Sequence, residues 1–365
     1  TPVSVATKEP GDSEGPIVHF IHVPLDAVPL LEGEKASAVE TELVTFLQFA
    51  AVQSVRKLVQ PRMMLLHYVD REPRGVWYTQ CQRHLSLHKV LAPKIAAKAT
   101  TAGVKAKPKN LKHDTPAAFN IYQRRQLMEF LIMLRVLQKH GGVAFSDFNT
   151  FVLRDTLLQS MENVGERAAI ASHAAETSAG DGNVLRVGVH TLQAPAGHEF
   201  IKYLEHELLA LIAADDPKLH WMPLEQLVGQ LTLTRYNHEH AAGKTNSNST
   251  ASDVVVGSSS LFEGVPQHEI PSLLSATVGE SSEKVSFRGV TAFHLDKYDF
   301  QLKRNDTEPL EAIQKLERTI VAAADILEKD EKGEARASVS NSLVHALLRF
   351  AVGLNSTAEL DRHFN

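Results

Sequence analysis

Apolar and polar positions along the chain follow two periods, one typical of buried strands and one typical of amphipathic helices. Short apolar runs predict strands at 17–22, 62–70, 85–91, 143–145, 167–172 and 184–190. Apolar residues at every third or fourth position predict helices at 37–59, at 116–140 and within 192–212. This alternation of strands and helices indicates an α/β fold, with a central sheet flanked by helices.

The helix predicted at 116–140 has clear start and stop signals. Thr115 is a suitable N-cap, and Pro116 suits the first helical position, where its missing N–H costs nothing. Gly141 and Gly142 follow the helix, and glycine commonly ends one. We therefore expect the helix to lead directly into the strand that begins at Val143.

A polar and acidic sequence, SDFN, follows this strand at 146–149. In α/β folds, ligands bind beyond the carboxyl ends of the strands. Asp147 is therefore a candidate binding residue, and Asn149 lies two positions after it.

By composition the chain divides into three parts. Residues 1–16 are polar, contain Pro and Gly, and are expected to be an extended tail. Residues 17–303 form the expected α/β domain, in which the polar low-complexity stretch 237–262 is expected to be a flexible insertion. Residues 304–365 contain two amphipathic segments and are expected to form an added C-terminal helical pair.

Composition narrows the function classes. A chain of 365 residues can bury a large core. Its net charge of −5 argues against broad nucleic-acid binding, although a local basic groove stays possible. The single cysteine, Cys81, excludes an internal disulfide framework and zinc sites built from cysteines. No apolar run reaches the roughly 18 residues of a membrane span.

Signals for the cellular compartment point in two directions. N-x-S/T sequons at Asn248, Asn305 and Asn355 favour the secretory lumen. The chain begins with Thr1 rather than Met, so we expect that a targeting or anchor segment has been removed. The Golgi lumen and, for a structural subunit, the mitochondrion are the two locations we consider.

The order of helix, GG, apolar strand and acidic motif resembles the D-x-D glycosyltransferases, such as the α-1,6-mannosyltransferases and the α-1,4-galactosyltransferases. Their motif is close to YGGIYLDLD, and this chain has HGGVAFSDFN. With one extra residue in the strand, Asp147 matches the first acid and Asn149 takes the place of the second. The opening strand at 17–22, the loop and helix at 192–212, and a turn at 227–235 also resemble the family.

The resemblance implies a GT-A-like, Rossmann-related fold that binds a UDP- or GDP-linked sugar through Mn²⁺ or Mg²⁺ and transfers the sugar to a glycan or protein acceptor. Asp147 and Asn149 would bind the metal. His294, in the sequence TAFH, matches a late family histidine that approaches the metal and diphosphate, with Lys297 as a nearby phosphate contact.

This chain also departs from the family pattern. The family carries S-D-x-x-R on the helix before the glycines, and these residues hold the donor sugar. In this chain the two key positions fall on Phe130 and Met133, which cannot hydrogen-bond a hydroxyl. Glu129 and Arg135 are the nearest polar substitutes, and both are expected to lie off the required face.

Two function hypotheses follow. The chain is either a divergent, metal-dependent glycosyltransferase or a catalytically inactive relative. In the second case it serves as a structural or interaction subunit of a larger assembly, for example in an organelle. Its partners would then be protein subunits. The basic segment from Lys94 to Lys112 could face RNA, although a solvated loop is the simpler interpretation.

Overall fold

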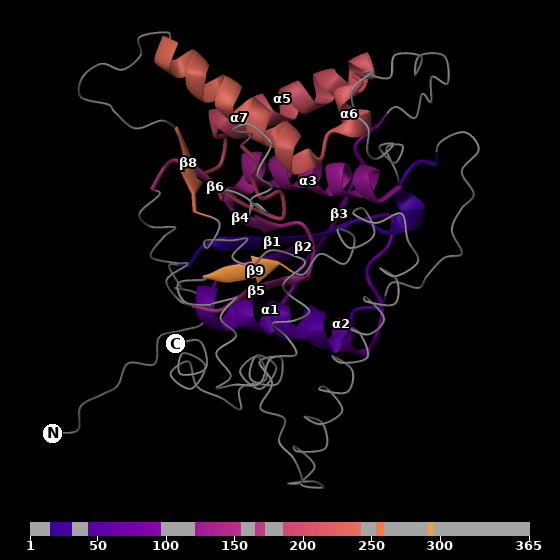
Figure 1. Cartoon of the computed structure of the whole chain (residues 1–365). Helices are drawn as coiled ribbons and strands as arrows, with labels where there is room; N and C mark the ends of the chain where they lie inside the picture. Colours follow the sequence, from indigo (N-terminus) through magenta and orange to yellow (C-terminus); the bar gives the residue numbers. More distant parts are fainter. Residues whose placement is uncertain are drawn as a thin grey trace, which may run out of the picture.

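The computed structural model describes residues 15–30, 43–95, 121–154, 165–171, 185–241, 253–258 and 291–294. A central sheet lies between two layers of helices, with α3, α5, α6 and α7 on one side and α1 and α2 on the other (Figure 1). A small two-stranded sheet, β5 with β9, lies on the α1 side (Figure 1).

The central sheet has seven strands. Their spatial order is β3 (Ser86–Val90), β2 (Met63–Val69), β1 (Ile17–His22), β4 (Gly142–Phe145), β7 (Thr191–Ala194), β6 (Ala168–Ala171) and β8 (Val254–Gly257). The first four strands are parallel, as are β6 and β8, whereas β7 runs antiparallel to both of its neighbours. The α/β class predicted from the sequence is confirmed, as a mixed and mostly parallel sheet flanked by helices.

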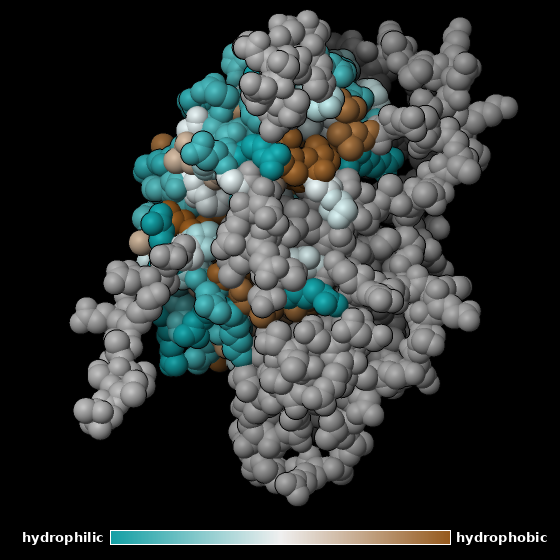
Figure 2. Space-filling model, turned by 90° about the vertical axis from the view of Figure 1, so that its left-hand side faces the viewer, coloured by the Kyte–Doolittle hydropathy of each residue, from teal (hydrophilic) through white to brown (hydrophobic). Residues whose placement is uncertain are grey.

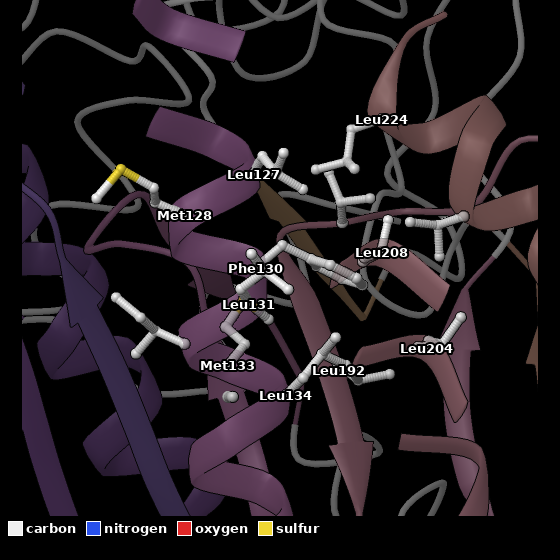
Figure 3. Packing of buried hydrophobic residues seen from close by; sticks show 14 of the residues in the cluster. Leu127, Met128, Phe130, Leu131, Met133, Leu134, Leu192, Leu204, Leu208 and Leu224 are labelled. Atoms are coloured by element: carbon white, nitrogen blue, oxygen red, sulfur yellow. The ribbon is translucent and has the colours of Figure 1, made fainter. Parts of the chain in front are cut away.

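Helix α3 (Ile121–His140) forms the centre of the larger core. Its buried side chains meet β7 and the helices α5 (Glu199–Ala214) and α7 (Leu224–Ala241). Figure 3 shows the contacts from α3 to this layer, with Leu192, Leu204, Leu208 and Leu224 around the helix. Each such leucine contributes about 1.5–3 kcal/mol when it is buried, so α3 is fixed against the sheet.

On the opposite face, α1 (Phe46–Val59) packs beside β5 (Thr150–Val152) and α2 (Val76–Gln82). Ser54 is a buried polar residue in the apolar face of α1. Its hydroxyl donates to the carbonyl of Ala51 at 2.7 Å and accepts from the N–H of Val152 at 3.0 Å. This pair of bonds attaches β5 to α1 and thereby fixes the segment that follows Asp147.

The two glycines after α3 allow β4 to approach β1. Gly142 has a φ of +106°, and a Cβ atom there would lie 2.2 Å from the carbonyl oxygen of Ile17. Gly141 has a φ of +64°, and its N–H donates to the carbonyl of Leu137 at 2.8 Å. Only glycine fits both the backbone conformation and the space at residue 142.

Three sequence predictions need correction. The helix predicted at 37–59 begins at Phe46, because Thr45 forms a capping box with Gln48. The strand predicted at 184–190 is irregular between 185 and 190, and the N–H of Val187 bonds to Glu225 at the start of α7 instead. The turn expected at 227–235 lies inside α7, whose helical hydrogen bonds override the local resemblance.

The stretch 237–262, expected to be a flexible insertion, is described at 237–241 and 253–258. The first part is the end of α7, and the second contains β8, which pairs in parallel with β6. These parts are regular structure. The other residues of this stretch lie outside the described part of the chain. The same holds for the tail at 1–14, the extension 304–365, the basic segment beyond Ile95 and all three sequons.

The remaining short elements are η1 (Leu25–Ala27), α6 (Lys218–Trp221) and β9 (Ala292–His294). On the face shown in Figure 2, the described surface is mainly hydrophilic, with apolar side chains in small groups. Among the helices that the structure describes, none is both long and apolar enough to cross a membrane.

Candidate functional site

The candidate site forms where β4 ends and the chain turns into β5. The N–H of Ser146 donates to the carbonyl of His190 at 2.9 Å, which ties this turn to the residue before β7. β5 then pairs antiparallel with β9, with Thr150 opposite His294. This pairing brings Asp147 and His294 together, although they are 147 positions apart in the sequence.

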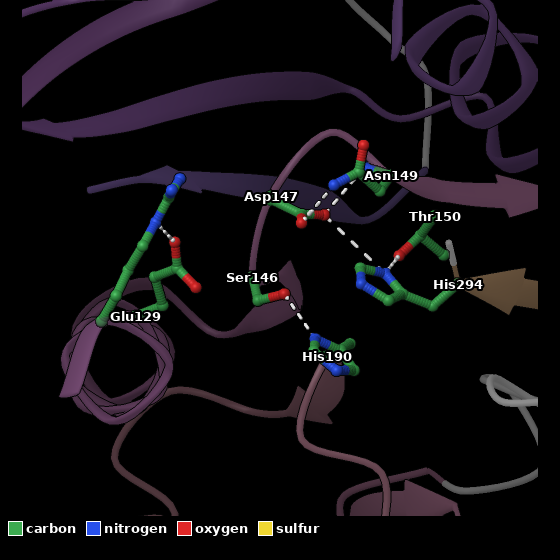
Figure 4. A network of polar contacts seen from close by, with 8 residues as sticks. Glu129, Ser146, Asp147, Asn149, Thr150, His190 and His294 are labelled. Atoms are coloured by element: carbon green, nitrogen blue, oxygen red, sulfur yellow. Dashed lines mark hydrogen bonds and ion pairs between the residues drawn. The ribbon is translucent and has the colours of Figure 1, made fainter. Parts of the chain in front are cut away.

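Asp147 and Asn149 form a closed turn. The N–H of Asn149 donates to Oδ1 of Asp147 at 2.7 Å, and its side-chain Nδ2 donates to Oδ2 at 2.6 Å. A carboxylate only accepts hydrogen bonds, so the amide nitrogen of Asn149 must face it and the amide oxygen must point away. Figure 4 shows this arrangement.

His294 lies beside this turn, fully buried. Its Nδ1 is 2.9 Å from Oγ1 of Thr150 and 3.7 Å from Oδ1 of Asp147 (Figure 4). Its ring stacks on that of His190, with centroids 3.8 Å apart and an interplanar angle of 6°. Nδ1 of His190 is in turn 3.0 Å from Oγ of Ser146. The three predicted residues Asp147, Asn149 and His294 therefore do converge.

Sequence reasoning assigned no role to three buried polar residues that hold this cluster, namely Ser146, Thr150 and His190. Ser146 and Thr150 flank Asp147 and Asn149 in the polar run at 146–150, whereas His190 carries no local motif. Only the pairing of β4 with β7 and of β5 with β9 puts them in contact.

Helix α3 adds a buried pair of ionisable residues to the site. Nε of Arg125 donates to Oε1 of Glu129 at 2.8 Å, and both side chains are only 7% exposed. Burial raises the pKa of Glu129 to about 8; the Arg125 guanidinium acts in the opposite direction, and Asp147 raises this pKa further. Glu129 was expected to lie off the face used by the family, yet it points toward Ser146 and Asp147 (Figure 4). The i, i+4 spacing of Arg125 and Glu129 was the signal available in the sequence.

The two positions that hold the donor sugar in the family lie in the core. Phe130 and Met133 are fully buried in the cluster around α3 (Figure 3). Arg135 is held elsewhere, because its Nε donates to Oε1 of Glu205 on α5 at 2.7 Å. None of these three side chains is placed to contact a sugar at the end of β4.

The residues around Asp147 do not fit a hard divalent cation. Mn²⁺ and Mg²⁺ prefer several oxygen ligands, and here one carboxylate faces an amide N–H₂ group and an imidazole. The amide oxygen of Asn149 is turned away, so the pair cannot chelate one ion. Among the described residues there is also no group of three or more His, Cys, Asp or Glu side chains arranged to hold a metal. Lys297 lies outside the described residues.

No protein-family model and no curated protein sequence matches this chain. Several solved structures resemble it distantly, among them a glycosyltransferase and a UGPase. The PaToxG glycosyltransferase has a TM-score of 0.33 and 10% identity, covering 64% of this chain and 73% of its own. The UTP-bound UGPase from Acinetobacter baumannii has a TM-score of 0.27 and 10% identity, and the match covers 62% of this chain and 94% of the UGPase chain. Similarity at this level carries no argument about activity, donor or acceptor.

Proposed function

We propose that this chain is a GT-A-like relative of the glycosyltransferases that no longer transfers sugar and that acts as a structural or interaction subunit. The observation that carries the proposal is the closed Asp147–Asn149 turn. Asn149 bonds to both carboxylate oxygens at 2.7 and 2.6 Å, so the residue in the second acid position satisfies the first instead of sharing a metal with it.

The positions on α3 support the same function. A donor-binding aspartate and arginine are polar and must reach solvent, whereas Phe130 and Met133 are fully buried. They contribute to the packing of α3 against the sheet and α5. In this chain the helix face that would bind a sugar therefore stabilises the fold.

The second candidate function is a metal-dependent glycosyltransferase that uses a UDP- or GDP-linked sugar. It is favoured by the convergence of Asp147, Asn149 and His294, which come from two distant segments. Glu129, with its raised pKa, adds a group that could exchange a proton near neutral pH. This function requires Asn149 to turn its amide oxygen toward an ion.

Calorimetric titration of UDP- and GDP-sugars, with and without Mn²⁺, separates the two functions. The structural proposal predicts no Mn²⁺-dependent heat for any donor. Micromolar binding that requires Mn²⁺ and disappears in Asp147→Ala would overturn it and establish the glycosyltransferase. Glu205→Gln, which alters a polar contact of α3 away from the turn, is the matched control and should behave as the wild type in either case.

A further inference from the structure

Four histidines form a row along the α3 face of the sheet. His19 is on β1, His67 on β2, His88 on β3, and His140 is the last residue of α3. Ring centroids are 5.1 Å apart for His19 and His67, 5.5 Å for His67 and His88, and 5.9 Å for His19 and His140. His88 is exposed at the edge strand, whereas His19 and His67 are 0% and 2% exposed. This histidine row contains no residue of the site at the end of β4.

Hydrogen bonds fix the protonated nitrogen of the two buried rings. Nε2 of His19 is 2.8 Å from the carbonyl oxygen of Gly141, and because a carbonyl only accepts, His19 must carry its proton on Nε2. Its Nδ1 therefore presents a lone pair, 2.9 Å from Nε2 of His67, and His67 must donate there. The neutral His67 ring is left with an unprotonated Nδ1.

Nδ1 of His67 is buried and has no hydrogen-bond partner among the described residues. A buried polar atom of this kind calls for a ligand or an ordered water. Nε2 of His67 is directed at His19 on β1. The two nitrogens of an imidazole ring face in divergent directions, and we therefore infer that Nδ1 faces the β3 side. His88 is the register partner of His67 on β3, so its imidazole lies on that side and on the same face of the sheet.

We propose that His67 and His88 bind a borderline transition-metal ion such as Zn²⁺, Ni²⁺ or Cu²⁺, with solvent completing the coordination. Imidazole nitrogen suits these metals, and it does not suit Mg²⁺ or Mn²⁺. The chain from His67 through His19 to the Gly141 carbonyl matches the arrangement in which a metal-binding histidine donates its other N–H to an acceptor that orients the ring.

Charge limits the affinity of this two-histidine site. Burial lowers the pKa of His67 most, and the positive charges of His140 and Lys139 lower it further. Among the residues that the structure describes, no carboxylate opposes them. A cation is therefore bound by the imidazole lone pairs and against the local field. Lys139→Gln should tighten metal binding, and the affinity order should follow Cu²⁺ above Ni²⁺ and Zn²⁺.

The test is titration of the full chain with Zn²⁺ and Ni²⁺ by calorimetry at neutral pH, followed by the same titration on His88→Gln and His67→Gln. His88 is exposed, so its substitution leaves the fold intact. The result for His88→Gln therefore decides the test even if His67→Gln fails to fold. We expect one binding event to weaken by roughly tenfold or more in either variant. His206→Gln, an exposed histidine on α5, should leave it unchanged.

Three results would overturn the proposal. One is a titration in which His88→Gln and His206→Gln lose the same amount of binding, which would mean diffuse binding to surface histidines. Another is the absence of any binding by Zn²⁺ and Ni²⁺, which would assign the buried lone pair of His67 to an ordered water. Binding of Mn²⁺ with equal affinity at this site would also contradict the imidazole chemistry.

Discussion

The side-chain amide of Asn149 lies 2.6 Å from Oδ2 of Asp147, so the second residue of the acidic motif is a hydrogen-bond donor to the first. In a metal-binding pair both residues would instead direct oxygens toward a shared ion. The substitution Asn149→Asp, which replaces the amide nitrogen by an oxygen, would convert the hydrogen-bonded pair into a pair of metal ligands.

Asn149→Asp should create a divalent-cation site. Two carboxylates in this turn repel each other, and a bound Mn²⁺ relieves the repulsion because charge count governs affinity for hard cations. We expect Mn²⁺ affinity to rise by roughly tenfold or more and stability without metal to fall. Calorimetry with Mn²⁺ measures the first effect and thermal unfolding the second.

The double variant Asp147→Asn/Asn149→Asp is the matched control for this gain. It carries one carboxylate, like the wild type, and should return to wild-type affinity. Equal Mn²⁺ affinity in Asn149→Asp and the wild type would show that the two side chains do not meet as described.

Restoring the family's sugar-binding residues should unfold the protein. Phe130→Asp and Met133→Arg would each place a charge at a position that is 0% exposed. We expect a loss of more than about 4 kcal/mol for each, because a buried charge without a partner is among the most destabilising changes. Urea denaturation measures the loss. The control Phe130→Leu, which keeps the position apolar, should cost no more than about 1.5 kcal/mol. If Phe130→Asp were as stable as the wild type, this face of α3 would lie outside the core.

The buried histidine pair should make the protein sensitive to acid. Burial lowers the pKa of His19 to about 4 and that of His67 to about 3. Below pH 6.5 the unfolded chain takes up protons that the folded histidines do not, so stability falls as pH decreases from 6.5 toward 4, by up to about 1.4 kcal/mol per pH unit for each group.

His67→Gln isolates this effect, because glutamine can still donate to Nδ1 of His19 but does not titrate. Denaturation at pH 7.5, 6.0 and 5.0 should show the wild type losing more stability with acid than the variant, by up to about 1.4 kcal/mol per pH unit. Parallel curves for the two proteins would mean that His67 is not held neutral in the fold.

Glu129 should change the stability of the fold with pH in the direction opposite to that of His19 and His67. With its pKa raised to about 8, the folded carboxyl keeps its proton while the unfolded one loses it above about pH 4.5. Stability from this group is therefore present at acid pH and is lost as pH rises from 4.5 to 8. Between pH 4.5 and 6.5 this effect of Glu129 offsets part of the histidine effect.

The variant Glu129→Gln, which mimics the protonated carboxyl, should flatten this pH dependence when denaturation is measured between pH 5 and 8. A uniform loss of about 3–5 kcal/mol across that range would instead show that Glu129 is the ionised partner of Arg125.

Gly142→Ala should be strongly destabilising for reasons of space. The new Cβ would lie 2.2 Å from the carbonyl oxygen of Ile17, and φ is +106°. We expect a loss of more than about 3 kcal/mol, from strain and from separation of β4 and β1. Gly197→Ala is the control, because φ there is also positive, at +72°, but nothing lies within 4 Å of the new Cβ. If thermal unfolding showed the same loss of stability in Gly142→Ala and Gly197→Ala, the whole loss would come from the positive φ and none from the contact with Ile17.

The sequence by itself determined the α/β class, most of the described strands and α3 with its glycine stop. These features depend on local periodicity and on backbone chemistry, which adjacent residues encode. It also identified Asp147, Asn149 and His294 as neighbours, through a resemblance. The strand predicted at 184–190 was wrong, because an apolar run of that length can lie in an irregular buried segment as well as in a sheet.

Only the tertiary structure decided what the site contains. His190 and Glu129 reach it through strand pairing and the packing of α3, and no spacing in the sequence encodes their contacts with Ser146 and Asp147. The direction of the Asn149 amide depends on a turn of two residues and on the single acceptor it faces. The histidine row likewise exists because parallel strands place His67 beside His88. Chemistry between distant residues depends on register and orientation, which only the folded chain fixes.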